Sequence, residues 1–204
     1  MAEELSVSII LASASPRRQQ LLAEAGYKFA VVTADIDESA FTVEHIGPCA
    51  YARRVALAKA KSVAGDFPDC LVIAADTVVD FDGEIIGKPA DAEDAERITR
   101  KLFSKPHKVI TAVAFVRLTD GVELVESDTT TVYPKKMSEE RLAEHIKSGS
   151  WQGKAGAYAI QEGGDEFIEK IDGSLTNVMG LPMELLEQML GKVIARSEKY
   201  KGIG

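Results

Sequence analysis

A short polar stretch near the start of the chain has the residue types of a phosphate-binding turn. Residues 9–11 are large and apolar and predict a buried strand, and Ser15 followed by Pro16 predicts the cap and first turn of a helix. Only small residues, 12–14, lie between these two elements, so a ligand could approach the backbone closely. The free N–H groups and partial positive charge of a helix start favour an anion at this place.

Two adjacent cations, Arg17 and Arg18, fall in the first turn of the same predicted helix. Cations at the positive end of a helix are unfavourable unless an anion binds there, so the pair supports a phosphate cradle. The alternative is an ordinary strand–helix turn with solvated arginines, and the local sequence leaves both interpretations open. Ser13 could bind phosphate, but as a covalent nucleophile it would need a base, and no histidine is recognisable near it.

A carboxylate interrupts one of the most apolar runs of the chain. Residues 71–79 are rich in β-branched side chains and predict a central strand that is covered on both faces, with Asp76 inside it. A buried carboxylate is costly unless it is paired or bound to a cation. We therefore expect Asp76 to have a partner, a metal or a catalytic task, and a hydrogen-bonded structural aspartate is the alternative.

Two lysines are candidates to join this carboxylate. Lys59 lies in a predicted helix over residues 48–65, next to a face of small residues that could border a cleft. That face is expected to contain Val55, Ala58 and Ser62. Lys88 follows a hairpin signal at residues 82–83 and a short returning strand. For Lys59 the alternative is a solvated surface lysine.

Two further stretches contain candidate ligands. The predicted loop 34–48 carries four acids, including Glu38, which either face solvent or supply one ligand to a metal or a cleft. Residues 153–161 alternate small side chains with Tyr158 and Ile160 and predict a strand that could line a pocket closely. Gln161 at the end of this stretch could read the edge of a nucleobase, and an exposed strand end is the alternative.

Strands and helices alternate along the chain, which predicts an α/β fold in one domain, residues 1–204. A strong hairpin signal at residues 119–121 makes the sheet mixed rather than purely parallel. The expected strands are 9–11, 29–33, 71–79, 84–86, 109–118 and 122–133. The expected helices start at residues 16, 48, 91, 138 and 183, the last ending near residue 195 before a frayed tail.

The net charge of −8 argues against a nucleic-acid surface, so an anionic substrate would need the cations concentrated in one cleft. Cys49 and Cys70 form neither a metal spacing nor a disulfide framework, and Cys70 is expected to be buried. The acidic start lacks the basic residues of a signal peptide, and no apolar run reaches the roughly 20 residues of a membrane span. These features predict a cytoplasmic protein without a membrane partner.

Residues 13–18 resemble the signature of the Maf (septum-formation) nucleotide pyrophosphatases, and four further segments match that family's motifs in order and spacing. These segments are residues 75–77, 87–89, 154–161 and 177–182. The resemblance implies a mixed, twisted sheet with flanking helices and two lobes around a deep cleft, similar to inosine triphosphate pyrophosphatases. It also implies hydrolysis of nucleoside triphosphates to monophosphates and diphosphate with a divalent metal, Mg²⁺ or Mn²⁺. Family members are often dimers, so a homodimer is possible.

The resemblance further assigns roles to individual residues. Arg17, Thr77 and Gln161 match the branch of the family that prefers dTTP and UTP, whereas the branch that prefers 7-methyl-GTP tends to have Trp, Gln and Glu there. The residue equivalent to Asp76 is the family's usual proton acceptor, and we expect it to work together with the metal. The expected catalytic residues are Asp76, Lys88 and Lys59, the expected substrate-binding residues are Ser13, Arg17, Arg18, Thr77 and Gln161, and the expected metal ligands are Glu38 and Asp76.

Two other functions remain open at this point. One is a house-cleaning pyrophosphatase for modified nucleotides, which a panel of triphosphates would distinguish. The other is a nucleotide-binding regulator of cell division with little turnover, which an assay of diphosphate release would distinguish. Asp76, Lys88 and Glu38 together argue against the second, because binding alone does not require a carboxylate beside phosphates.

Overall fold

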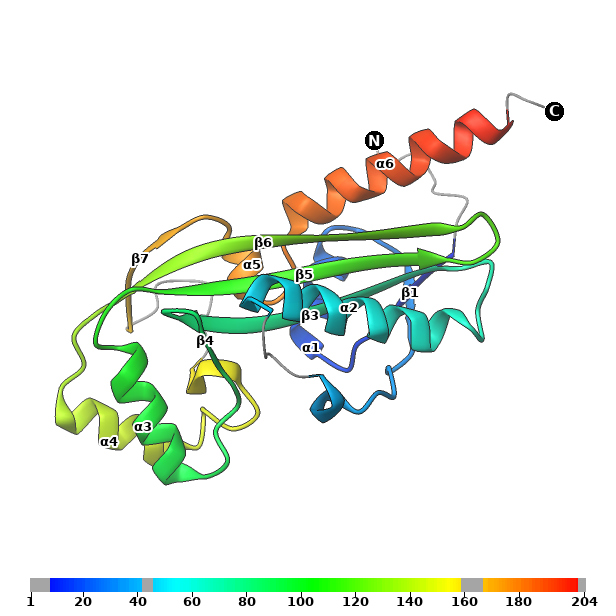
Figure 1. The fold of residues 1–204 in the computed structure, drawn as a ribbon. Coiled ribbons are helices and arrows are strands. Elements are labelled where there is room, and N and C mark those ends of the chain that lie inside the picture. The colour runs from blue at the N-terminus through cyan, green and yellow to red at the C-terminus, as the bar shows by residue number, and fades with distance from the viewer. Residues whose placement is uncertain (1–7, 42–45, 159–166, 202–204) are drawn as a thin grey trace.

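The computed structural model of the chain describes residues 8–41, 46–158 and 167–201, and these contain a seven-stranded mixed sheet (Figure 1). The strand order is β2-β1-β3-β5-β6-β7, and β4 pairs with β3. β1, β2 and the start of β3 are parallel, and the other pairs are antiparallel. The strands are β1 (Ile9–Leu11), β2 (Phe29–Val31), β3 (Leu71–Phe81), β4 (Glu84–Ile86), β5 (His107–Arg117), β6 (Val122–Pro134) and β7 (Ile168–Asp172). The expected mixed α/β sheet is thus confirmed.

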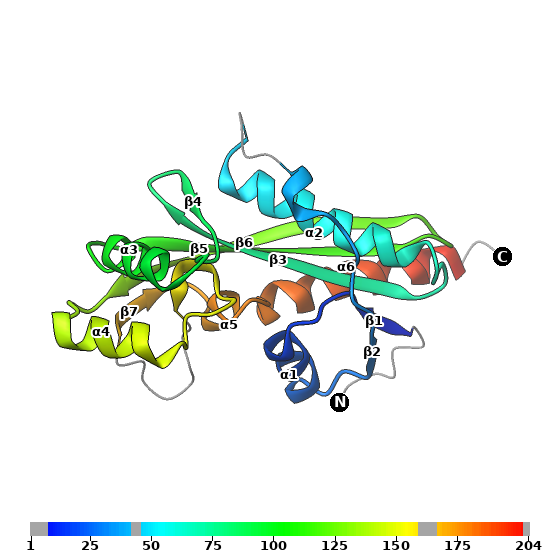
Figure 2. The same ribbon diagram turned by 90° about the horizontal axis from the view of Figure 1, so that it is seen from below.

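Helices flank this sheet on both faces (Figure 2). They are α1 (Pro16–Glu24), η1 (Glu38–Ala40), α2 (Pro48–Ala64), α3 (Ala92–Leu102), α4 (Glu139–Ser148), η2 (Ala155–Ala157), α5 (Leu175–Val178) and α6 (Met183–Lys201). The chain moves outward from β1 to β2 and then back past β1 to β3. Crossovers between parallel strands are right-handed in nearly all proteins, so these two opposite directions are expected to put α1 and α2 on opposite faces, where their buried residues lie. Both faces of β3 are therefore covered, as its largely apolar sequence predicts.

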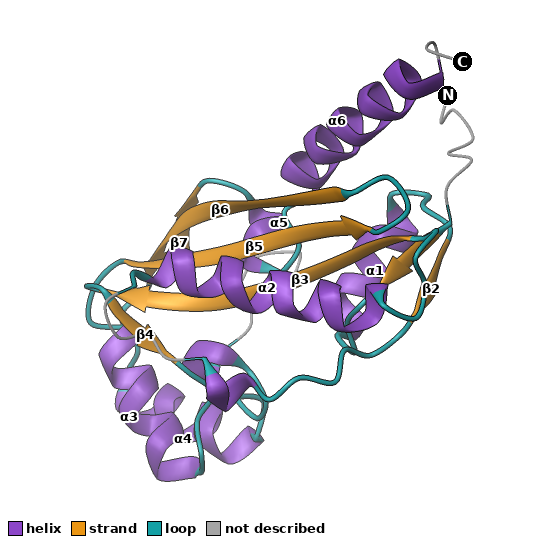
Figure 3. Cartoon of the chain, turned by 45° about the vertical axis from the view of Figure 1, so that its right-hand side comes forward, coloured by secondary structure: helices purple, strands orange, loops and turns teal. Residues whose placement is uncertain are grey.

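The core has three parts. In the first, α1 and α6 pack on one face of the sheet; in the second, α2 covers the other face, as Figure 3 shows. In the third, α3 packs with η2. The buried face of α2 is rich in alanine, which lets this helix lie close to β3 and β5. It consists of Ala52, Val55, Ala56, Ala60, Val63 and Ala64. Of the small residues that the sequence analysis grouped on one face, Val55 is buried, Ala58 is half-buried and Ser62 is exposed.

Several local expectations were wrong. The stretch expected as a strand over residues 153–161 contains the 3₁₀ turn η2, with positive φ angles of 75° at Gly156 and 61° at Ala157. Gly156 is needed there, because a Cβ would lie 3.0 Å from Leu102 Cδ1. The sequence also missed β7 and α5, and α6 continues beyond the predicted end to Lys201. Cys70 is half-buried rather than buried.

β7 was missed because its residues do not alternate between apolar and polar types in a clear pattern. It pairs with β6 as an outer strand of the sheet, and most of it is exposed. No helix in the described ranges is both long enough and apolar enough to span a membrane.

Candidate active site

The sheet has an open edge at the middle of β3. β1 pairs with residues 71–73 of this strand and β4 with residues 79–81. Between them, residues 74–78 have no strand neighbour on that side in the described part of the chain. β1 stops at Leu11 because the chain turns away there into α1, and Ala12 makes a last backbone hydrogen bond to Ile73. In open α/β sheets, ligand sites form at the point where two successive connections run to opposite sides of a strand. Here the connections from β1 to β2 and from β2 to β3 run in opposite directions across the sheet.

A cleft of about 880 Å³ lies along this open edge. Its size falls in the range of sites for small molecules. One side is formed by residues 12–18 and 178–180, and the other by residues 85–88 and 152–155. The residues that the sequence analysis singled out therefore lie around one cavity, except Gln161, which is outside the described residues.

Alternation along β3 sends two adjacent polar side chains to opposite faces of the sheet. Asp76 faces α2, where its Oδ1 lies 2.8 Å from Lys59 Nζ. Thr77 faces the other way, and its Oγ1 accepts a hydrogen bond of 3.0 Å from Arg18 Nη2. Both residues border the cleft, because the open edge exposes the strand to it from the side. The cleft thus has two differently lined parts, one on each face of the sheet.

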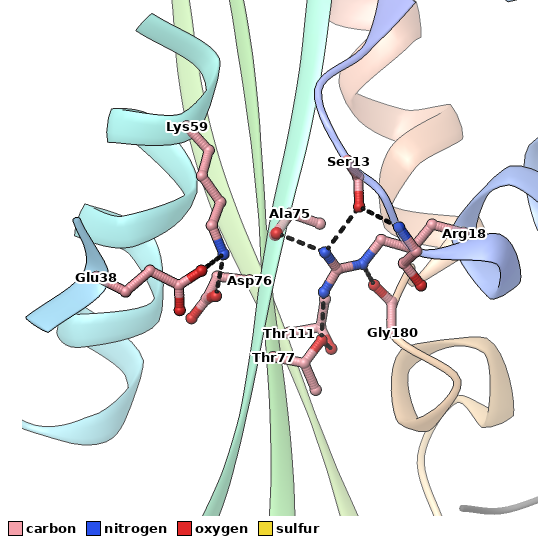
Figure 4. A network of polar contacts seen from close by, with 10 residues as sticks. Ser13, Arg18, Glu38, Lys59, Ala75, Asp76, Thr77, Thr111 and Gly180 are labelled. Carbon is pink, nitrogen blue, oxygen red and sulfur yellow. Dashed lines mark hydrogen bonds and ion pairs between the residues drawn. The ribbon is translucent and has the colours of Figure 1, made fainter. Parts of the chain in front are cut away.

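Lys59 joins two carboxylates on the α2 side of the cleft (Figure 4). Its Nζ lies 2.8 Å from Asp76 Oδ1 and 2.8 Å from Glu38 Oε1. The Asp76 side chain is only 11% exposed and that of Lys59 only 13%, so this pairing compensates the cost of burying Asp76. Burial raises the pKa of Glu38, but the hydrogen bond from Lys59 and the charges of Lys88 and Arg18 outweigh it and lower that pKa.

Asp76 and Glu38 are two carboxylates beside the cleft that could hold a divalent cation. Within the described ranges, no third histidine, cysteine or acid joins them to complete a cage of protein ligands. Mg²⁺ commonly uses one or two carboxylates together with water and the phosphates of a substrate, rather than a complete protein cage. Asp76 and Glu38 supply oxygen ligands of the right chemistry for this arrangement.

Arg18, expected as a substrate ligand, is mainly bonded to the protein itself. Its Nε donates to Gly180 O at 2.7 Å, and its Nη1 donates to Ala75 O at 2.8 Å and to Ser13 Oγ at 3.3 Å. With the bond to Thr77, four of the five N–H groups of the guanidinium have protein partners. Burial lowers the pKa of Arg18, and the charges of Asp76 and Glu38 oppose this. Arg18 therefore connects α1, β3 and the segment before α6 across the floor of the cleft.

Ser13 is buried, and the hydrogen-bonding role of its hydroxyl is set by two donors. Its Oγ accepts from the Ser15 backbone N–H at 3.2 Å and from Arg18 Nη1. The hydroxyl proton has no acceptor among the described residues, so it can be donated to an anion in the cleft. Neither contact could take this proton, so a covalent nucleophile activated by a neighbouring base has no support in the geometry.

Three further cations surround the cleft. Arg17 is half-buried and Lys88 is exposed, and both border the cavity. Lys154, which the sequence analysis did not assign to the site, also borders it. Burial and the charge of Arg17 together lower the pKa of Lys154, so these two cations are close enough to interact. Its position inside the 154–161 motif was the signal that could have identified it.

Sequence reasoning also missed a buried histidine behind the cleft wall. His107 Nδ1 lies 3.2 Å from Leu102 O and must donate to it, so Nε2 accepts the hydroxyl proton of Tyr158 at 2.5 Å. Burial lowers the pKa of His107 to about 4, which keeps the ring neutral at pH 7. The lone histidine at residue 107 gave no pattern in the sequence, because its partner is distant along the chain.

The family described as "Maf-like protein" matches residues 8–193 of this chain. This chain belongs to that family. A "dTTP/UTP pyrophosphatase" of Citrifermentans bemidjiense is 46% identical over 86% of this chain and 90% of its own length. A protein of the same name from Bdellovibrio bacteriovorus is 41% identical, over 91% of this chain and 98% of its own length. The resemblance to Maf proteins expected from the motifs is confirmed.

Solved structures resemble this Maf protein more weakly. A nucleoside-triphosphatase, or dITP/XTP pyrophosphatase, of Mycobacterium abscessus aligns with a TM-score of 0.43 and 16% identity. That alignment covers 95% of this chain and 96% of the other.

Proposed function

We propose that this Maf protein hydrolyses the nucleoside triphosphates dTTP and UTP to the monophosphate and diphosphate. The observation that carries the proposal is the buried pair of Asp76 and Lys59 at the open edge of β3, in a cleft with further cations. An acid beside several cations suits phosphate chemistry, in which a charged substrate must be held and a water molecule oriented. The named activity of relatives that are 41% and 46% identical supports the same conclusion.

The cations of the cleft would bind the phosphate chain. Arg17 offers a planar fork for phosphate oxygens, and Lys88 and Lys154 offer mobile point charges. The uncommitted hydroxyl proton of Ser13 and the start of α1 add donors at the same end of the cavity. These groups offset the roughly four negative charges of a triphosphate within a protein that is itself acidic.

Asp76 would orient the attacking water and accept its proton. Lys59 binds Oδ1, and the second carboxylate oxygen has no partner among the described residues. That oxygen can therefore hold a water molecule against the α-phosphorus, while Lys59 fixes the direction of the carboxylate. A divalent cation held by Asp76 and Glu38, Mg²⁺ or Mn²⁺, would acidify the water and neutralise phosphate charge.

Release of diphosphate from a panel of triphosphates, with and without Mg²⁺, tests this function. We expect dTTP and UTP to be the preferred substrates and turnover to require the cation. A preference for modified nucleotides would replace the substrate assignment, and absence of turnover with every triphosphate would refute the enzyme assignment. A cytoplasmic location and a homodimer stay predictions; light scattering coupled to size-exclusion chromatography measures the second.

A further inference from the structure

A line of three hydroxyl and carbonyl groups runs inward from the floor of the cleft. Thr77 of β3 lies directly opposite Thr111 of β5 in the register of the two strands. Their hydroxyl oxygens are 2.9 Å apart, and Thr111 Oγ1 is 2.8 Å from Asn177 O. Figure 4 shows Thr77 and Thr111 side by side under the guanidinium of Arg18.

The chemistry of these groups fixes the direction of every hydrogen bond in the line. Asn177 O is a carbonyl oxygen and can only accept, so the single hydroxyl proton of Thr111 is donated to it. Thr111 must then accept from Thr77, whose own proton is thereby used. One lone pair of Thr77 accepts from Arg18 Nη2. What Thr77 has left for a ligand is one lone pair, so toward the cleft it is an acceptor and not a donor.

Asn177 holds this line rigidly in place. The residue is fully buried, and its amide Oδ1 accepts from the Thr111 backbone N–H at 3.1 Å. Its Nδ2 donates to Val109 O and to Thr130 Oγ1, each at 2.9 Å. All amide protons of the side chain are thus used, and the carbonyl that orients Thr111 cannot turn away.

The apolar part of the cleft beside Thr77 suits a nucleobase. On the opposite face of β3 the lining includes the charged group of Asp76, Lys59 and Glu38. On the face of β3 that carries Thr77, the lining contains the Arg18 guanidinium and also the apolar or aromatic residues Val79, Val109, Tyr158, Val178 and Met179. A flat base fits apolar walls with a few fixed polar groups, which set its orientation and the selectivity.

We propose that Thr111 is a positioning residue for base selection. By accepting the proton of Thr77, it keeps that hydroxyl an acceptor, which can receive the N3–H of thymine or uracil. Cytosine has an unprotonated N3 that would face the lone pair of Thr77 without a hydrogen bond. This inference rests on the proposed function in one respect, because it takes a pyrimidine nucleotide as the ligand.

Binding of the product monophosphates UMP and CMP tests the inference without any turnover. Isothermal titration calorimetry would compare the wild-type chain with Thr111→Val, which keeps the shape and removes the hydroxyl, and with Thr111→Ser, which keeps the hydroxyl. We expect wild type and Thr111→Ser to bind UMP at least tenfold more tightly than CMP. In Thr111→Val the Thr77 proton is released and can be donated to cytosine N3, so this ratio should fall about tenfold.

A purely structural role for Thr111 would weaken UMP and CMP equally, and an unchanged ratio in a folded Thr111→Val chain overturns the inference. Equal affinity of the wild type for UMP and CMP overturns it as well. If Thr111→Val does not fold by circular dichroism, Thr111→Ala takes its place, because it also removes the hydroxyl. A ratio that falls in Thr111→Ala supports the inference, and an unchanged ratio overturns it. Diphosphate release is a separate measurement, so failure of the proposed function is distinguishable from these outcomes.

Discussion

Replacing Lys59 by methionine should leave a buried carboxylate without its partner. Asp76 Oδ1 lies 2.8 Å from Lys59 Nζ. The Coulomb attraction between two unit charges at this distance is about 6 kcal/mol at an effective dielectric constant of about 20. Burying both charges consumes much of that attraction, and breaking a buried pair by removing one partner costs about 3–5 kcal/mol. The Glu38 side chain is 51% exposed and can turn toward the solvent, so losing its contact with Lys59 adds little to the loss of stability.

We therefore expect Lys59→Met to lower the free energy of unfolding by about 3 kcal/mol, or the Tm by about 6–12 °C for a chain of this size. Asp76→Asn should cost only about 1 kcal/mol, because Lys59 keeps Glu38 as a partner. The double variant, with neither charge, should cost about 2 kcal/mol, which gives a coupling energy of about 2 kcal/mol. Urea unfolding of the four chains at pH 7 measures these quantities.

Lys61→Met is the matched control on the same helix. Lys61 pairs with Glu123 at 2.9 Å, but both side chains are about half exposed, so its replacement should cost less than about 0.5 kcal/mol. The reasoning is refuted if Lys59→Met costs no more than Lys61→Met. A coupling energy near zero between residues 59 and 76 would refute it too.

Four further predictions concern the site and the residues that pack behind it. Asp76→Asn should fold normally but lose nearly all diphosphate release, and retained turnover would contradict its role. Arg17→Ala should change the preference among bases more than it changes stability, and an unchanged substrate profile would contradict that role. Burial lowers the pKa of His107 to about 4 in the folded chain, below the roughly 6.5 of a histidine in the unfolded chain. As the pH falls below 6.5, the unfolded state therefore binds the proton first, and the free energy of unfolding decreases. Between pH 6.5 and pH 5 this loss should be about 1.5 kcal/mol in urea unfolding and should disappear in His107→Gln, while an unchanged slope would contradict the assignment. Gly156→Ala should lower the free energy of unfolding by about 1–3 kcal/mol, because φ is +75° and a Cβ would crowd Leu102 and Val79; a Tm equal to wild type would show that η2 adapts freely.

Much of the fold was predictable because it rests on local patterns. The apolar run 71–79, the Ser15–Pro16 cap and the turn at residues 119–121 each carry a short-range signal, and each marks an observed strand, helix or hairpin. η2 was not predictable in the same way, because its positive φ angles are set by close packing of Gly156 against Leu102. In the sequence, the small residues next to Tyr158 form a pattern typical of a strand. Only the residues packed around them in the folded chain exclude a strand there.

The residue types and their spacing already indicate which groups could do chemistry: a carboxylate within an apolar strand, cations at a helix start, and motifs that match the Maf family. How these groups are paired depends on the folded chain. Side chains alternate along β3, so Asp76 meets Lys59 of α2 while its neighbour Thr77 meets Arg18 of α1. The same packing bonds Arg18 to Ser13 and Thr77 and so sets the hydrogen-bonding roles of their hydroxyls. Such roles depend on which donor or acceptor lies within about 3 Å, and chain folding brings these partners together from as far as 162 residues apart.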